Sequence, residues 1–263
     1  MPELPDVEVY RRYLNATSLH QGIRDVEIRT DQILEGTSPL KIKAGLRNRS
    51  LESTDRHGKF LFVALDNQGW LVLHFGMTGD LKYYKNPIKE PEYTKFLIEY
   101  TNDYHLALVM PRKLGLVRLI LDMQKFIKEK ELGPDVYQDG FGYEMFKALL
   151  EGRRGMIKPT LMNQQIMAGI GNVYSDEILF QARVHPRLPV DQLQEERLRK
   201  IFKATKDVLE TAIQKKADPE QFPASWIIPH RQKGGECPNC GGKVRNISVS
   251  GRSVYYCPDC QPT

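Results

Sequence analysis

The sequence predicts an α+β protein of several domains: an N-terminal β-sandwich with flanking helices, a helical domain, and a C-terminal four-cysteine zinc finger. Three observations lead to this prediction. The 263 residues exceed the usual size of a single domain. Between about residues 22 and 120 short apolar segments alternate with turn residues, whereas helical patterns prevail after about residue 122. All four cysteines lie between residues 237 and 260.

The chain opens with Pro2-Glu3-Leu4-Pro5 after the initiator methionine. This methionine is usually removed before a small residue such as proline, which would leave Pro2 with a free secondary amine. An α-amino group has a pKa of about 7.7–8.0, so a useful fraction is neutral and nucleophilic at pH 7. Attack on an aldehyde-like carbon would give an iminium ion, which is a strong electron sink. Taken alone, Met-Pro is also an ordinary start.

Residues 2–14 are expected to form a helix, because apolar side chains recur at helical spacing at Val7, Tyr10 and Leu14. Pro5 is compatible with this helix because it falls in the first turn. The amine of Pro2 would then stand at a helix entrance, where backbone N–H groups favour negative charge.

The next hundred residues read as strands. Short apolar segments lie at 59–65, 70–75, 96–100, 105–110 and 116–121. Turn residues at 66–69 separate the segments 59–65 and 70–75, and turn residues at 102–103 separate 96–100 and 105–110. Both arrangements predict hairpins. Several short antiparallel strands of this kind are typical of a sandwich.

The following residues read as helices. The expected helices span 141–151, 160–167, 172–181 and 191–216. Asn172 is a plausible N-cap of the third. The fourth shows the clearest amphipathic pattern and ends before Asp218-Pro219.

The cysteines form two Cys-x-x-Cys pairs, Cys237/Cys240 and Cys257/Cys260. This spacing predicts one tetrahedral Zn²⁺, and four thiolates leave no open position for a substrate, so the metal should be structural. Two disulfides are the alternative, which a cytosolic compartment disfavours. Between the pairs the sequence suits a hairpin turning near residues 250–251, with Arg252 just past the turn.

The charge distribution permits an acidic partner. The net charge is +5 and the pI about 8.9, and cations outnumber acids after Trp226, so phosphate is a natural ligand there.

The loop before residue 172 contains Gly169 and Gly171, which allow close approach of a ligand. We expect an anion site at the start of the following helix, with basic residues nearby that suit DNA phosphates: Arg153, Arg154 and Lys158. The loop lacks the Lys-Ser/Thr of a P-loop, so no nucleotide cofactor is expected.

No apolar run reaches the 18 or more residues of a membrane span, and the acidic N-terminus does not resemble a signal peptide. We therefore expect no membrane partner and a cytoplasmic, nucleoid-associated location.

Six separated motifs occur in order along the chain: 2–5, 56–59, 74–77, 111–115, 163–172, and 251–252 inside the four-cysteine segment. Together they resemble the formamidopyrimidine-DNA glycosylase/endonuclease VIII family, and most closely formamidopyrimidine-DNA glycosylase. The resemblance implies a catalytic sandwich over 1–121, a linker over 122–140, a helix–two-turn–helix domain over 141–225 and a zinc finger over 226–263. It also implies a monomer that acts on double-stranded DNA containing damaged bases.

The resemblance implies the chemistry as well. Pro2 would attack C1′ of a damaged nucleotide, release the base and form the iminium, and β- and δ-elimination would follow. Glu3 would be the general acid that opens the sugar, Lys59 would assist at this centre, and Arg252 would bind the phosphate beside the lesion.

Further residues match DNA-binding positions of the family. Met77, Arg112 and Leu114 match the side chains that fill the space left by the extruded nucleotide, and Lys113 lies in the same basic turn. Lys158 and Asn172 match phosphate-binding positions of the helix–two-turn–helix motif, and Arg153 lies nearby.

Several departures from the family pattern affect substrate choice. Asp6 and Leu114 replace the usual glutamate and phenylalanine, Met110 and Asn163 replace aspartates, and the segment 217–236 is too short for the usual lesion-capping loop. Oxidised purines are the expected substrates. Oxidised pyrimidines or abasic sites are the alternative, and a zinc protein that binds damaged DNA without catalysis is a third possibility.

Overall fold

The computed structural model describes residues 1–262. The chain forms two compact units, one of residues 1–2 and 6–130, the other of residues 3–5 and those from Glu131 onward. The division falls inside the expected linker over 122–140, part of which is the helix α3 (Met123–Glu129). The boundaries of the four segments expected from the sequence stay predictions.

The first unit contains two four-stranded sheets in which every paired strand is antiparallel. One sheet has the order β1 (Ile23–Ile28), β6 (Thr94–Tyr100), β7 (His105–Val109), β5 (Asp80–Tyr84). The other has the order β2 (Leu51–His57), β3 (Phe60–Leu65), β4 (Trp70–His74), β8 (Leu116–Ile120). The predicted sandwich is confirmed, and so are both hairpins, β3–β4 and β6–β7.

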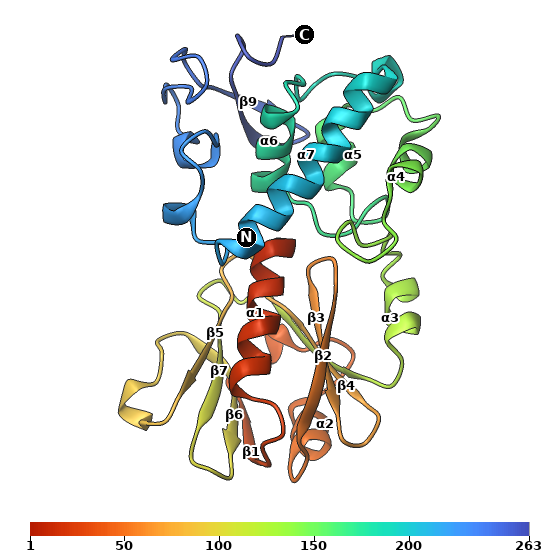
Figure 1. The fold of residues 1–263 in the computed structure, drawn as a ribbon. Helices are drawn as coiled ribbons and strands as arrows, with labels where there is room; N and C mark the ends of the chain where they lie inside the picture. The colour runs from red at the N-terminus through yellow and green to blue at the C-terminus, as the bar shows by residue number, and fades with distance from the viewer. Residues whose placement is uncertain (263) are drawn as a thin grey trace. The chain divides into compact units, whose positions relative to one another are not determined.

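Helix α1 (Leu4–Thr17) lies between the two sheets of this unit (Figure 1). Val7 and Leu14 are fully buried, as the helical spacing predicted, and pack in one core with residues of both sheets such as Val26 and Val63. Helix α2 (Pro39–Leu46) was not predicted, although Ser38 caps it and Pro39 occupies its first turn.

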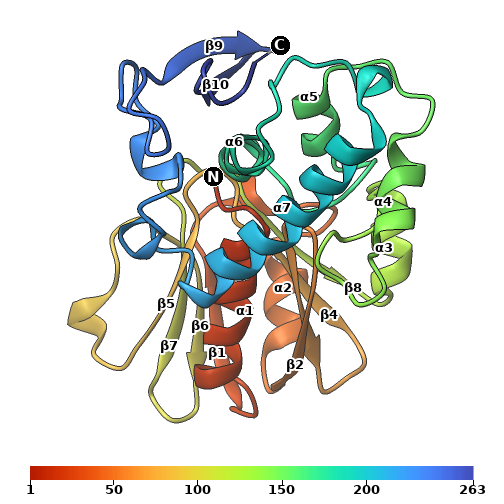
Figure 2. The ribbon, with the colours of Figure 1, turned by 45° about the horizontal axis from the view of Figure 1, so that its top comes forward.

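The second unit contains helices α4 to α7 and the hairpin of the zinc finger. Its elements are α4 (Tyr143–Leu150), α5 (Ile157–Met162), α6 (Asn172–Gln181), α7 (Glu195–Gln214), β9 (Arg245–Val249) and β10 (Arg252–Tyr256). Helix α6, seen nearly end on in Figure 2, packs against α5, α7 and β10. The hairpin turns at residues 250–251 as predicted.

Three helices differ from the prediction. Helix α6 begins at Asn172 as expected, but its N-cap is Gly171. Helix α5 spans Ile157–Met162 instead of 160–167. Helix α7 begins at Glu195, because Val190–Gln192 forms a separate 3₁₀ turn. Across residues 1–262, none of the helices combines the length and apolar character that crossing a bilayer requires.

His74 ends strand β4 and is held in its neutral form. Its Nδ1 atom accepts a hydrogen bond from the backbone N–H of Gly76 at 3.2 Å, and its ring centre lies 4.9 Å from that of Phe60. Burial, with the positive charges of Lys59 and Lys130, lowers the pKa of His74 to about 4.

We expect His74 to destabilise the first unit in mild acid. Its pKa is about 4 in the folded chain and about 6.5 in an unfolded one, so only the unfolded chain takes up a proton between these values. The stabilisation is complete above about pH 6.5 and is lost as the pH falls toward 4. Between about pH 7.5 and about pH 5, the free energy of unfolding should fall about 2 kcal/mol more in the wild type than in His74→Gln. Equal losses would exclude His74 as the titrating group.

Candidate functional site

The carboxylate of Glu3 caps the N-terminus of helix α6. Its oxygens accept hydrogen bonds from the backbone N–H groups of Gly171 at 2.7 Å, Val173 at 2.8 Å and Tyr174 at 3.3 Å. Glu3 is only 1% exposed. A buried carboxylate needs such partners, and the unpaired N–H groups of a helix start favour a negative charge.

The two glycines before α6 make this contact possible. A Cβ atom on Gly171 would lie 2.3 Å from Cδ of Glu3, and one on Gly169 would lie 2.4 Å from Cδ1 of Leu4. Gly169 also has a φ of +120°, which disfavours any other residue. The predicted close approach to this loop is therefore confirmed, but the group that approaches is the N-terminal segment of the chain itself. The expectation that these N–H groups face a DNA phosphate is wrong for the three that Glu3 occupies.

The backbone after Glu3 is held as well. The N–H of Leu4 donates to the carbonyl of Gly169 at 3.1 Å, so Glu3 is fixed through its side chain and through the residue that follows it. Pro2 is buried and Met1 is 44% exposed. While Met1 is present, the nitrogen of Pro2 is part of a peptide bond; removal of Met1 turns it into the secondary amine that can act as a nucleophile.

Lys59 lies in the two-residue turn that joins β2 and β3 of the first unit. The turn is tight because Gly58 adopts a φ of +57°, and Lys59 itself is only 8% exposed. Its charge contributes to the lowered pKa of His74.

Two further turns of the first unit lie side by side. A Cβ atom on Gly76 would meet the carbonyl carbon of Leu114 at 2.5 Å, so the turn carrying Met77 contacts the turn carrying residues 111–115. Met77 is 37% and Leu114 is 61% exposed. Arg112 and Lys113 are exposed as well. The structure thus gathers the residues expected to fill the space of an extruded base.

The second unit has a cleft of about 380 Å³ between helix α5 and the hairpin of the finger. Its walls include Met162, Asn163, Ser250 and Arg252. Arg252 is exposed, and its Nη1 atom lies 3.9 Å from Sδ of Met162 across the cleft. Arg153 is exposed on the loop after α4.

Lys158 has a different place from the one expected. It is 1% exposed, and its ammonium group lies 2.7 Å from Oδ1 of Asp176, 2.6 Å from Oγ of Ser175 and 2.9 Å from the carbonyl oxygen of Asn172. Burial lowers the pKa of Lys158, and the charge of Asp176 opposes this shift. Lys158 lines the cleft together with Arg252, but its ammonium group is engaged by these three partners and joins α5 to α6. Its role as a phosphate-binding residue stays a prediction.

Asp176 is a functional residue that sequence reasoning missed. Its Oδ2 atom accepts hydrogen bonds from Arg231 at 2.9 and 3.0 Å and from the backbone N–H of Tyr255 at 3.2 Å. One turn earlier, Nδ2 of Asn172 donates to the carbonyl of Ser253 at 3.0 Å. Both contacts hold strand β10, which carries Arg252, against helix α6. The polar run 175–177 inside a helix was the available signal.

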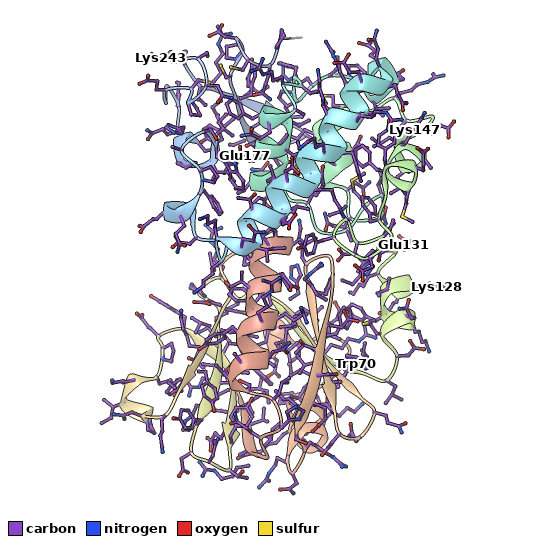
Figure 3. All side chains as sticks on the ribbon, viewed as in Figure 1. Trp70, Lys128, Glu131, Lys147, Glu177 and Lys243 are labelled. Carbon is purple, nitrogen blue, oxygen red and sulfur yellow. The ribbon has the colours of Figure 1, made fainter. Side chains whose placement is uncertain are left out.

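Glu177 is the third member of that polar run and lies on helix α6 (Figure 3). Its oxygens accept from the backbone N–H of Ile228 at 2.9 Å and from Gln181 at 2.7 Å. Burial raises the pKa of Glu177 to about 7. It ties the segment after α7 to the same helix.

The four cysteines come together as a metal site. The sulfurs of Cys237, Cys240, Cys257 and Cys260 all lie within 4.8 Å of one another. The pairs Cys237/Cys260 and Cys240/Cys257 are 3.7 and 3.5 Å apart, far from the roughly 2.05 Å of a disulfide. Zn–S bonds of about 2.3 Å in a tetrahedron place sulfurs at about this spacing. The predicted structural Zn²⁺ is confirmed.

Comparison with known proteins agrees with this geometry. Family models match residues 1–117 (formamidopyrimidine-DNA glycosylase N-terminal domain), 132–223 (the H2TH domain of the same enzyme) and 234–263 (a zinc finger found in FPG and IleRS). The chain belongs to the formamidopyrimidine-DNA glycosylase family. It is accordingly a DNA glycosylase of base excision repair with AP lyase activity, and the resemblance found in the sequence is confirmed.

Relatives match over nearly the whole chain. A formamidopyrimidine-DNA glycosylase of Arabidopsis thaliana is 32% identical over 99% of this chain and 71% of its own. One from Pelotomaculum thermopropionicum is 30% identical over 99% of both. The Lactococcus lactis enzyme, in complex with DNA containing an AP site, is 26% identical over 100% of both chains with a TM-score of 0.89.

Replacing Gly171 with Ala should displace Glu3 from helix α6, because the new Cβ would overlap its carboxyl carbon. Losing these hydrogen bonds should lower the free energy of unfolding by about 1–3 kcal/mol and glycosylase activity by more than about tenfold. Gly155→Ala is the matched control, since its Cβ would meet nothing closer than 3.7 Å. Activity assays and thermal unfolding check both variants. Wild-type activity and stability in Gly171→Ala would contradict the contact between Glu3 and the start of α6.

Replacing Cys257 with Ser should abolish zinc binding, because three thiolates remain and the finger lacks a core sufficient to fold alone. Metal analysis should fall from about one zinc per chain to near zero, and DNA binding should be lost while the first unit keeps its unfolding transition. Ser253→Ala on the same hairpin should keep the metal. Tight DNA binding by the zinc-free variant would refute the role of the finger.

Proposed function

We propose that this chain removes oxidised purines, such as formamidopyrimidine and 8-oxoguanine, from double-stranded DNA and then cuts the strand at the resulting site. The observation that carries the proposal is the fixed carboxyl group of Glu3, which is buried at the start of α6 and belongs to the residue directly after Pro2. A secondary amine in the residue before a fixed carboxyl group is suited to covalent attack on a sugar carbon.

The reaction runs through a covalent intermediate. The nitrogen of Pro2 attacks C1′ while the bond from C1′ to the base breaks, and the base leaves with the electron pair. Glu3 takes up the proton that the Pro2 amine loses on attack and passes it to the ring oxygen, whose bond to C1′ then breaks, which gives a cationic iminium. The iminium acidifies the C2′ proton; its removal expels the 3′-phosphate, and a second elimination expels the 5′-phosphate. Lys59 assists at this centre.

The remaining predicted residues bind DNA. Because the damaged nucleotide must leave the stack to be reached, its place has to be filled, and the adjacent exposed turns with Met77 and 112–114 are suited to this role. Arg252 and Arg153 are exposed cations that can bind phosphates. Asn172 is assigned to the same surface. The protein acts as a monomer in the cytoplasm, on the nucleoid.

Two observations support a preference for oxidised purines, and two others favour a different substrate. The Lactococcus lactis enzyme is structurally similar in a complex with DNA containing N7-benzyl-Fapy-dG, with a TM-score of 0.90, and the opening motif matches the purine branch. An aliphatic Leu114 and a short segment between α7 and Cys237 favour oxidised pyrimidines as a second candidate.

Borohydride reduction tests the proposed nucleophile. Wild-type protein without Met1 should form a covalent adduct with DNA containing an abasic site, because reduction fixes the iminium. Pro2→Gly should lose at least about 100-fold in trapping rate, and an N-terminal extension should abolish trapping. Pro87→Ala, an exposed proline of the first unit, should trap normally. Absence of an adduct from Met1-free wild type would defeat the proposal.

The same assay on a lesion panel separates the candidates. Faster cleavage of 8-oxoguanine and formamidopyrimidine than of 5-hydroxyuracil duplexes supports the purine assignment. The reverse order supports the pyrimidine assignment. Tight binding of every duplex without turnover would leave only a damaged-DNA-binding protein.

A further inference from the structure

A buried cluster in the first unit is used neither by the proposed chemistry nor by DNA binding. Glu8 on helix α1 is 4% exposed and faces three guanidinium groups. Nε and Nη2 of Arg11 donate to its two oxygens at 2.9 and 2.8 Å, and Nε of Arg12 donates at 2.9 Å. Nε of Arg56 lies 3.4 Å from Oε2. Burial raises the pKa of Glu8, but the charges and hydrogen bonds of the arginines outweigh it and lower the pKa overall.

The three arginines differ in position. The side chain of Arg12 is 54% exposed and that of Arg11 is 29% exposed, whereas that of Arg56 is 6% exposed. An exposed pair with Glu8 contributes little. A desolvated guanidinium, in contrast, is held in place, because leaving its partner would strand a buried charge. The Glu8–Arg56 pair is therefore the rigid member of the cluster.

Arg56 also forms a hydrogen bond with the turn that carries Lys59. Its Nη1 atom donates to the carbonyl oxygen of Gly58 at 3.0 Å. That carbonyl belongs to the peptide bond leading into Lys59. The turn has only two residues, Gly58 has a φ of +57°, and His57 pairs with Phe60 on either side of it. Rotation of this single peptide would move the side chain of Lys59, and the guanidinium prevents it.

We propose that Arg56, held by Glu8, is a positioning residue for Lys59. Helix α1, which Pro2 leads into, fixes Glu8; Glu8 fixes the guanidinium of Arg56; and the guanidinium fixes the Gly58–Lys59 peptide. Arg56 touches no reacting atom. The inference rests on the proposed role of Lys59 at the reaction centre, and it gives the reason for an arginine three positions before that lysine.

Arg56→Ala tests the inference without removing the whole cluster. Glu8 keeps both hydrogen bonds from Arg11 and the one from Arg12, so no buried charge is stranded and the chain should fold. The single-turnover rate of borohydride trapping on abasic-site DNA should fall roughly 100-fold, the cost of about 1 Å of misplacement. The Kd for a non-cleavable abasic analogue should stay within about threefold, because no DNA contact is lost.

Two matched variants separate positioning from packing. Arg12→Ala removes an arginine from the same carboxylate but leaves the turn untouched, so its trapping rate should stay within about twofold of wild type. Arg56→Lys keeps the charge but not the planar fork that contacts both Glu8 and Gly58, so it should recover only part of the lost rate. An equal loss in Arg12→Ala, or full recovery by Arg56→Lys, would overturn the proposal.

Combination with Lys59→Ala completes the test. If Arg56 acts through Lys59, the double variant should trap no more slowly than Lys59→Ala alone. Losses that multiply would show that Arg56 acts independently and would overturn the positioning role. If Lys59→Ala traps as fast as wild type, the role of Lys59 itself fails. If Lys59→Ala is slow and Arg56→Ala is normal, the role of Lys59 stands and the positioning role alone falls.

Discussion

The interaction on which the function depends is the seat of the Glu3 carboxylate on the first turn of helix α6. Three backbone N–H groups that a helix cannot satisfy internally meet one buried charge that water cannot reach. The carboxylate satisfies the N–H groups of the helix start, and these N–H groups stabilise the buried carboxylate. The contact joins residues 168 positions apart in the chain and fixes the residue that follows Pro2, close to a chain end where freedom is usually greatest. A catalytic amine at a chain end needs such a restraint, since a terminus that samples many positions rarely reaches attack geometry.

Buried ionic contacts also organise the rest of the second unit around helix α6. Lys158 from α5 and Arg231 from the segment after α7 both pair with Asp176. The Tyr255 N–H bonds the same carboxylate. Opposite charges that share a dry site orient one another strongly, because no water competes for them. The result is a hairpin held at fixed orientation on α6 although its own fold depends on zinc, which places Arg252 on the wall of the cleft.

The sequence predicted most of the features with local causes. The cysteine spacing, the two β-hairpins and the start of α6 at Asn172 follow from neighbouring residues and were confirmed. The sequence did not predict that Glu3 contacts the loop with Gly169 and Gly171, because no local pattern connects this loop to the N-terminus. Lys158 looked like a surface cation beside Arg153 and Arg154; its burial depends on Asp176, which no short-range pattern connects to it. Helix α2 was missed because it interrupts a β-rich stretch, although its Ser38-Pro39 start was readable.

Amide hydrogen exchange in wild type and Glu3→Gln tests the central contact most directly. The account predicts that the amides of Gly171, Val173 and Tyr174 are protected in the wild type and exchange at least about tenfold faster in the variant, as expected when charge-assisted bonds are lost. Amides in the middle of α7 should not change. Equal exchange at Gly171 and Val173 in the two proteins would contradict the account, because it would show that the helix start is satisfied without the carboxylate.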